Sequence, residues 1–365
     1  MKESCPTAKK IINGIQYLGG DEISIKTISE YKDENLEWKK LGYDIEMNKY
    51  VYNEPQNKIA KGLKYLFLYS AKWRKVLNEV SSDKYDIIQT ITPDYIPVLA
   101  SKYSKKPIFH HFREIMSIFP FQLFSDGLNP LSIGLKRAML TKMEKLALER
   151  CFLYSSDSKI WLEILQKRIR ITKEKLIIKN APLSIMIPKE KKEKLSRTDN
   201  RIRIVHHGHI NISTIKFIRQ TCERGVELHL YPIIKDENVK EEINQMRKYE
   251  NFIVHPNIIG YKNFIYEISQ YDYGLIPPPD RDLGLYFESY LPCKLYDYLA
   301  AGLPVIAGRS YKQISKFIKD EDVGYLIDDV DDLIKILKIG EAKKAKPITA
   351  DDDIRKLISK YKEYA

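Results

Sequence analysis

The stretch Pro292-Cys-Lys-Leu-Tyr-Asp-Tyr-Leu-Ala-Ala-Gly-Leu-Pro-Val-Ile-Ala307 decides the fold of this chain. Pro292 is typical of a helix start and Gly302 of a helix stop, so the pattern predicts a helix between them. A buried strand over Pro304–Ala307 follows after a short connection. In a parallel sheet covered by helices, this order places the amino end of the helix on the side of the sheet where ligands bind.

Short apolar runs alternate with segments of helical length along the whole chain, which predicts an α/β protein with parallel sheets. In the first half, we predict strands at Ile11–Leu18, Tyr43–Met47, Tyr85–Thr90, Pro107–His111 and Cys151–Ser156. The helices between them are predicted at Ile25–Leu41, Tyr95–Tyr103, Ile133–Arg150 and Lys159–Arg168. In the second half, the predicted strands are Ile202–His206, Glu227–Tyr231, Phe252–His255, Tyr273–Pro277 and Pro304–Ala307.

A charged segment separates the two halves and includes the run KEKKEK at Lys189–Lys194. This composition predicts an exposed linker. The predicted organisation is a first domain at 1–185, a linker at 186–200, a second domain at 201–345 and a tail at 346–365. Apolar residues on one face of a helix at Asp353–Tyr361 predict that the tail packs back onto the first domain.

Charge and cysteine content restrict the class of protein. The formal net charge of +12 predicts attraction to phosphorylated small molecules, nucleic acid or anionic lipid, and does not distinguish them. The four cysteines form no CxxC pair, which argues against a zinc knuckle and a disulfide framework. The sequence has neither a signal peptide nor a long apolar run, so we expect a cytoplasmic protein. Peripheral contact with the inner face of an anionic membrane stays open.

The predicted helix after Pro292 can bind a diphosphate through its amide N–H groups and its positive end. Asp297, on the same helix, can accept hydrogen bonds from ribose hydroxyls. The segment resembles the donor-binding signature of GT-B glycosyltransferases, notably glycosyltransferase family 4, which is commonly P-x-K-L-x-E-Y-x-A-x-G-x-P-V. Lys179-Asn-Ala-Pro182 and His207-Gly-His209 are similar to other parts of that pattern. The alternative is an ordinary helix–strand unit in which Asp297 is only an acid on a helix face.

The resemblance implies two Rossmann-like domains facing across a cleft, the GT-B fold, with a C-terminal helix that packs back on the N-terminal domain. It implies transfer of a sugar from a nucleotide diphosphate sugar to a glycan or lipid-linked glycan, with retention of configuration and with neither metal nor cofactor. The donor-binding residues implied are Gly208, His209, Lys216, Gly260, Glu288, Lys294, Leu295 and Asp297. Two positions depart from the family pattern, because Asp297 replaces the usual Glu and the earlier acid falls on Ser289, beside Glu288.

Polar residues in the first half supply candidates for catalysis. His110, His111, Arg113 and Glu114 follow a predicted strand and can neutralise a leaving diphosphate or position an acceptor hydroxyl. The alternative is a half-buried histidine and an ion pair between Arg113 and Glu114. Gly19 and Gly20 after the first predicted strand suggest a loop that approaches an acceptor or nucleotide.

Two apolar segments point to a lipid-linked acceptor or a membrane surface. One is the loop containing Ile115, Ile118, Phe119, Phe121, Leu123 and Phe124. The other is a predicted basic helix at Lys58–Leu77, for which an ordinary solvated face is the stronger interpretation. Asp280-Arg-Asp282 has the DxD spelling of a manganese site, but three residues recur by chance, so we assign no metal.

Other functions remain as alternatives. A sugar-nucleotide 2-epimerase shares the two-domain architecture. A non-enzymatic protein that binds polyanions or membranes on a transferase scaffold would also fit the charge. Nucleic acid is not expected as a partner, because no recognised DNA- or RNA-binding motif occurs.

Overall fold

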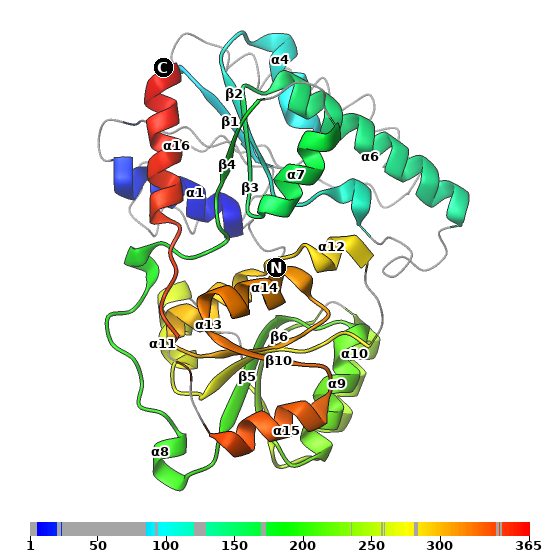
Figure 1. The fold of residues 1–365 in the computed structure, drawn as a ribbon, viewed down its shortest axis with the longest axis vertical. Coiled ribbons are helices and arrows are strands. Elements are labelled where there is room, and N and C mark those ends of the chain that lie inside the picture. Colours follow the sequence, from blue (N-terminus) through cyan, green and yellow to red (C-terminus); the bar gives the residue numbers. More distant parts are fainter. Residues whose placement is uncertain are drawn as a thin grey trace. The chain divides into compact units, whose positions relative to one another are not determined.

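A computed structural model shows two compact units, and each has its own parallel sheet (Figure 1). The first unit comprises Met1–Ser117, Gly127–Lys179 and Asp351–Ala365, and the second comprises Ile118–Asp126 and Asn180–Ala350. The structure describes residues 6–19, 23, 85–91, 94–119, 129–168, 173–234, 236–256, 258, 260–280, 284–340, 343 and 345–365. The predicted helices at Ile25–Leu41 and Lys58–Leu77 and the predicted strand at Tyr43–Met47 lie outside the described residues.

The first unit contains a four-stranded parallel sheet with the order β1-β2-β3-β4. Its strands are β1 (Ile88–Ile91), β2 (Ile108–Phe112), β3 (Leu153–Ser156) and β4 (Glu174–Ile177). The helices α4 (Tyr95–Tyr103), α6 (Pro130–Arg150) and α7 (Lys159–Arg168) connect them. Every residue of β2 and β3 is buried, as expected for central strands covered on both faces. This part of the predicted α/β pattern is confirmed.

Two terminal helices pack together in the first unit, α1 (Pro6–Gly19) and α16 (Asp351–Tyr364). The strand predicted at Ile11–Leu18 was wrong, because these residues belong to α1. Ile11 and Ile15 are buried at a spacing of four residues, which is a helical period. The C-terminal helix returns to the first domain as predicted, since the Tyr361 hydroxyl donates to Gln89 Oε1 at 2.7 Å.

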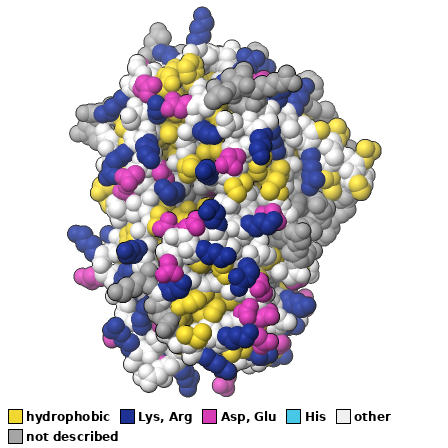
Figure 2. Space-filling model, viewed as in Figure 1, with side chains coloured by type: hydrophobic (Ala, Val, Ile, Leu, Met, Phe, Trp, Pro, Cys, Tyr) yellow, Lys and Arg dark blue, Asp and Glu magenta, His cyan; other side chains and the backbone are white. Residues whose placement is uncertain are grey.

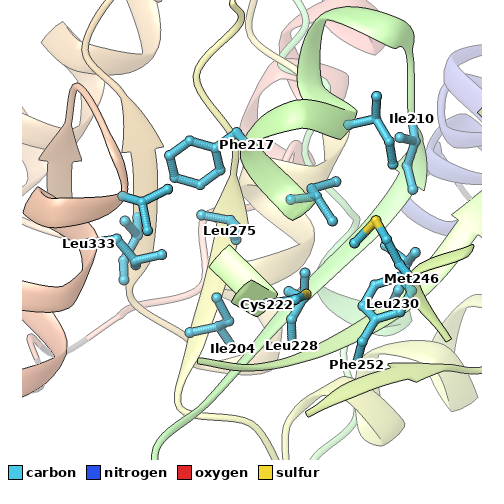
Figure 3. Close-up of a cluster of buried hydrophobic side chains, with 14 of the residues drawn as sticks. Ile204, Ile210, Phe217, Cys222, Leu228, Leu230, Met246, Phe252, Leu275 and Leu333 are labelled. Carbon is cyan, nitrogen blue, oxygen red and sulfur yellow. The ribbon is translucent and has the colours of Figure 1, made fainter. Parts of the chain in front are cut away.

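The second unit contains a six-stranded parallel sheet with the order β10-β9-β8-β5-β6-β7. Its strands are β5 (Arg203–His209), β6 (Glu227–Ile233), β7 (Phe252–Val254), β8 (Tyr273–Ile276), β9 (Val305–Gly308) and β10 (Gly324–Ile327). The helices are α9 (Ile212–Glu223), α10 (Glu237–Met246), α11 (Tyr261–Ile268), α12 (Gly284–Glu288), α13 (Cys293–Ala301), α14 (Lys312–Glu321) and α15 (Val330–Ile339). Figure 3 shows part of the apolar core, where Phe217, Leu230 and Leu333 are among the buried side chains.

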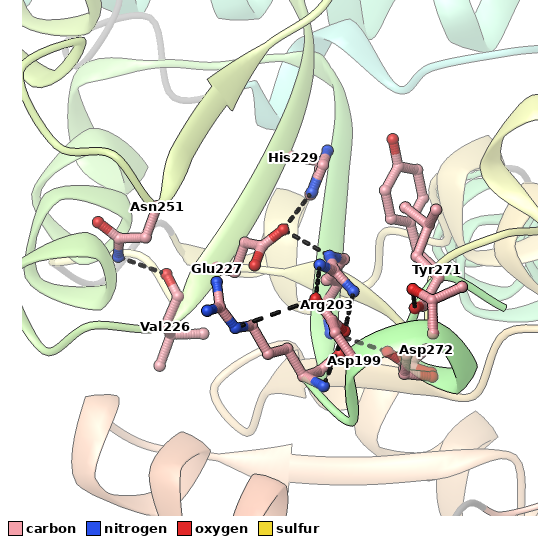
Figure 4. A network of polar contacts seen from close by, with 12 residues as sticks. Asp199, Arg203, Val226, Glu227, His229, Asn251, Tyr271 and Asp272 are labelled. Atoms are coloured by element: carbon pink, nitrogen blue, oxygen red, sulfur yellow. Dashed lines mark hydrogen bonds and ion pairs between the residues drawn. The ribbon is translucent and has the colours of Figure 1, made fainter.

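The segment predicted as a linker, 186–200, is hydrogen-bonded to the second unit. The Leu195 amide donates to the Gln270 carbonyl at 2.9 Å, and the Ser196 hydroxyl donates to Asp272 Oδ1 at 2.6 Å. Asp199, in the short helix α8 (Ser196–Asp199), forms an ion pair with Arg203 at the start of β5 (Figure 4). The charged segment is therefore attached to the surface of the second unit and is not a free linker.

Candidate functional site: the carboxyl edge of the second sheet

The strand order of the second sheet contains one point where the direction of winding reverses. From β5 the chain proceeds through β6 to β7 on one side, and then through β8, β9 and β10 on the other side. Strands β5 and β8 therefore separate beyond Val205, the last residue of β5 that pairs with β8. Open α/β sheets bind ligands outside the carboxyl ends of the strands at such a point. His206, His207 and Gly208 lie at this end of β5.

Helix α13 lies between β8 and β9 in the chain, so its amino end faces the same edge of the sheet. The helix runs over Cys293–Ala301, with Pro292 before it and Gly302 after it at a φ of 77°. The start and stop predicted from these two residues are confirmed. Lys294 lies in the first turn, and its Cε atom is 3.8 Å from the position that a Cβ would take on Gly208. A side chain at position 208 would therefore touch Lys294 across the winding reversal, and glycine leaves that space open.

Asp297 is buried and is held by residues from two other elements. The residue is 4% exposed, and its Oδ1 accepts a hydrogen bond from the Tyr261 hydroxyl at the start of α11. His207 Nε2 lies 3.6 Å from Asp297 Oδ2. A buried carboxylate is costly unless it is hydrogen-bonded or paired, and the hydrogen bond from Tyr261 offsets part of that cost. The orientation of this acid is therefore set within the second unit.

Tyr298 supports the strand end behind Asp297. Its hydroxyl accepts from the His207 amide at 3.2 Å and donates to the Leu275 carbonyl at 3.0 Å. The ring lies against Gly274, where an added Cβ would come 2.1 Å from Tyr298 Cγ. The hydroxyl therefore links β5 to β8 at the place where their pairing has ended.

Burial changes the charge states around the site. It lowers the pKa of Lys294 to about 8, and the neighbouring Cys293 and Asp297 act in the opposite direction. Burial also lowers the pKa of His207 well below its usual range, and the nearby charge of Lys294 adds to the effect. For Tyr261, burial and then the charge of Asp297 raise the pKa. At neutral pH the site thus contains a neutral imidazole, a protonated phenol that donates to Asp297, and a lysine close to its titration point.

The other predicted donor residues are placed as follows. Gly260 caps α11 with a φ of 91°, directly before Tyr261. Leu295 is buried, and its amide donates to the Pro292 carbonyl at 3.1 Å. Glu288 pairs with Lys312 at 2.7 Å. The side chains of His209 and Lys216 are exposed.

Sequence reasoning did not include Tyr261, His207 or Tyr298 among the site residues. The available signals were the position of Tyr261 next to Gly260 and of His207 next to Gly208. Their contacts with Asp297 join segments that are 36 and 90 residues apart, so only the strand order reveals them.

The histidines of the first unit lie inside strand β2, within the predicted strand Pro107–His111, and not in the polar loop to which they were also assigned. His110 Nδ1 is 2.8 Å from Thr90 Oγ1, and its Nε2 is 3.2 Å from Asp94 Oδ1. His111 Nδ1 is 2.9 Å from Ser155 Oγ. Both rings are fully buried, and burial lowers the pKa of His111 to about 3. Their side chains belong to the interior of the first sheet.

Arg113 and Glu114 follow β2 and lie near Asp157 at the end of β3. Arg113 Nε lies 4.0 Å from Glu114 Oε1, so the ion pair considered from the sequence is present. Asp157 is buried, and burial together with the charge of Glu114 raises its pKa to about 8. Gly19 is the last residue of helix α1 and does not follow a strand, which corrects the predicted glycine loop, and Gly20 lies outside the described residues.

The apolar loop predicted from the sequence is only partly described. Ile115 is fully buried, and the Phe119 ring packs edge-on against Tyr286 with centroids 5.0 Å apart. Phe121, Leu123, Phe124 and Asp282 of the DxD spelling lie outside the described residues. Within the described part of the chain, no three His, Cys, Asp or Glu side chains are arranged to hold a metal ion. None of the helices in that part has the length and apolar character needed to cross a bilayer.

Comparisons with known proteins define the class of fold. The structure of HepE from Anabaena, solved with UDP and glucose, is 14% identical, with a TM-score of 0.59 over 99% of this chain and 92% of that chain. The lipopolysaccharide outer core galactosyltransferase WaaB is 15% identical, with a TM-score of 0.58 over 97% and 91% of the two chains. These likenesses show the GT-B fold, with two Rossmann-like domains, as predicted.

The same fold occurs in UDP-GlcNAc 2-epimerases. The enzyme from Neisseria meningitidis, solved with UDP-GlcNAc, is 13% identical, with a TM-score of 0.61 over 99% of this chain and 98% of that chain. Sequence comparison is more specific, because residues 208–360 match the family described as Glucosyltransferase 3-like, C-terminal domain. The resemblance to GT-B glycosyltransferases is therefore confirmed. No curated protein matches the chain in sequence.

Proposed function

We propose that this protein is a glycosyltransferase that takes a sugar from a nucleotide diphosphate sugar. The observation that carries the proposal is the buried Asp297, which lies on α13 together with Lys294 and accepts a hydrogen bond from Tyr261 of α11. A carboxylate of fixed orientation can accept hydrogen bonds from the ribose hydroxyls. The match of residues 208–360 to a glucosyltransferase domain supports the same function.

The diphosphate would occupy the space in front of α13. Lys294 supplies a positive charge there, and the amino end of the helix adds its dipole. Gly208 has a φ of 85° and no side chain, so the backbone can bend and approach the phosphates closely. During transfer, the bond between the anomeric carbon and the diphosphate breaks, and these groups stabilise the charge that collects on the leaving phosphate.

We further propose that the acceptor is a glycan or a lipid-linked glycan, that the reaction retains configuration, and that it serves polysaccharide or glycoconjugate biosynthesis without a metal or cofactor. These points rest on the resemblance of Pro292–Ala307 to glycosyltransferase family 4. Arg113 and Glu114 are the candidates from the first unit, since they lie beyond the end of β2. Anomeric analysis of the product by NMR tests retention, and activity in excess EDTA tests metal independence.

Nucleotide binding by titration calorimetry tests the donor site. We expect UDP, GDP or ADP to bind in a saturable manner, and Asp297→Asn to weaken that binding about ten- to hundred-fold, as expected for loss of a charge-assisted hydrogen bond. Asp320→Asn is the matched control, because Asp320 is an exposed acid on the neighbouring helix α14. Equal affinity in wild type and Asp297→Asn would remove Asp297 from the donor site.

A second candidate function is epimerisation at C2 of a nucleotide sugar. The similarity of the fold to the Neisseria meningitidis enzyme over 99% of this chain favours testing it. Incubation with UDP-GlcNAc alone separates the two functions, because an epimerase forms a new sugar nucleotide without any acceptor. A transferase releases UDP only as sugar passes to an acceptor or to water.

A further inference from the structure

Helix α6 of the first unit has apolar residues on two opposite faces. The inner face carries Ile133, Ala147 and Leu148, which are all buried. The outer face of the amino-terminal half carries Leu131, Leu135 and Met139, which are 83%, 74% and 55% exposed. These three residues are spaced by four and therefore form one stripe along the helix. Figure 2 shows hydrophobic side chains at the edge of the molecule where α6 lies in Figure 1.

The three exposed residues lie on a helix that is held at its start by a cap and, farther along, by a buried ion pair. Pro130 occupies the first turn, and the Asn129 side chain accepts from the Ser132 amide at 2.8 Å, which caps the helix. The other end is anchored by Glu144, which is fully buried, accepts from the Ser117 amide at 2.9 Å and pairs with Arg168. The outer stripe is thus a preformed surface that needs no ordering when it binds.

The charges beside the stripe are basic. Lys142 continues the same face one turn beyond Met139, and Lys136 is also exposed. The acids of α6 are both paired, since Glu144 is buried against Arg168 and Glu149 lies 3.9 Å from Lys145. A stripe of apolar side chains with exposed lysines beside it complements an anionic lipid surface, in which the apolar groups enter the acyl region and the ammonium groups meet phosphates.

We propose that the outer face of α6 docks the protein on an anionic lipid surface. A second copy of the chain is the less suitable occupant, because a stable interface buries about 800 Å² on each partner and one line of three side chains covers far less. The proposal is independent of the donor site, because every residue that it uses lies in the first unit.

Flotation of the full chain with lipid vesicles tests this proposal. We expect binding to vesicles of phosphatidylcholine mixed with phosphatidylglycerol, weaker binding to phosphatidylcholine alone, and release by added salt. Leu131→Ser combined with Leu135→Ser should lower the partition coefficient at least ~10-fold, given about four-fold for each methylene that no longer enters the bilayer. Lys142→Gln should lower it about five-fold on the anionic vesicles only.

The matched control is Ile339→Ser, which changes an apolar residue of the second unit that is 65% exposed. It should bind vesicles as wild type does, and both serine variants should keep the wild-type melting temperature because the altered side chains are exposed. Failure of the wild type to float with anionic vesicles would overturn the proposal, as would equal loss in the control. Light scattering that shows a dimer lost in the double variant would assign the stripe to self-association and would also overturn it.

Discussion

Tyr298→Phe should destabilise the second unit, although it removes only one oxygen atom. The hydroxyl group accepts from the His207 amide at 3.2 Å and donates to the Leu275 carbonyl, which also has the His206 ring at 2.9 Å. Without the hydroxyl, the His207 amide loses its partner in a region that is buried from solvent. An unsatisfied buried N–H costs about 1–3 kcal/mol, and this is the expected loss in the free energy of unfolding.

Urea denaturation followed by circular dichroism measures this loss, and Tyr266→Phe is the matched control. Tyr266 is 39% exposed, so its variant should stay within about 0.5 kcal/mol of wild type. Because His207 and Gly208 lie on the freed strand end, Tyr298→Phe should also weaken nucleotide binding. A Tyr298→Phe protein as stable as the control would refute the idea that this hydroxyl replaces the strand pairing that ends at Val205.

Three further predictions concern charged groups. The pKa of Lys294 is near 8, so nucleotide affinity measured by calorimetry should fall as pH rises through about 8 in wild type and stay flat in Lys294→Gln. Asp157 binds its proton more tightly in the folded protein, because its pKa there is raised to about 8. The free energy of unfolding should therefore fall as pH rises from about 4 to 8. In Asp157→Asn, chemical denaturation should show a smaller fall in this free energy over the same pH range. Glu144→Ala removes the carboxylate that pairs with Arg168 and accepts from the Ser117 amide, and urea unfolding should show a loss of about 3–5 kcal/mol, whereas a loss under about 1 kcal/mol would contradict a structural role for the pair.

Helix α13 was predicted correctly from the sequence, and helix α1 was not. Pro292 and Gly302 mark the two ends of α13 directly, through the conformations that they favour. Helix α1 likewise begins at Pro6 and ends at Gly19. The strand was predicted from Ile11–Leu18 alone, whose apolar positions fit a short strand as well as one face of a helix. Burial of Ile11 and Ile15 against neighbouring elements decides for the helix, and this information lies outside the segment.

In the candidate site, too, some residues could be predicted from local sequence and others depend on the fold. Lys294, Asp297 and Gly208 could be predicted because they belong to short motifs with a recognisable spacing. The roles of Tyr261 and His207 depend on which strands are neighbours, and therefore on the reversal between β5 and β8. The histidines of β2 fell within the predicted strand Pro107–His111 but were also assigned to the polar loop after it, because a strand covered on both faces has no polar alternation to mark its end.

The position of Asp297 also explains how the second unit accommodates its departure from the family signature. Asp is one methylene shorter than the Glu expected there, so its carboxylate stays closer to α13, where it is 4% exposed. At that depth the charge needs partners supplied by the protein itself. The Tyr261 hydroxyl, kept protonated by burial and by the charge of Asp297, donates to one oxygen, and the His207 ring lies beside the other. The shorter acid and the tyrosine after Gly260 therefore act as one unit, because the buried carboxylate depends on the hydrogen bond from that tyrosine, and the neutral ring of His207 packs beside them.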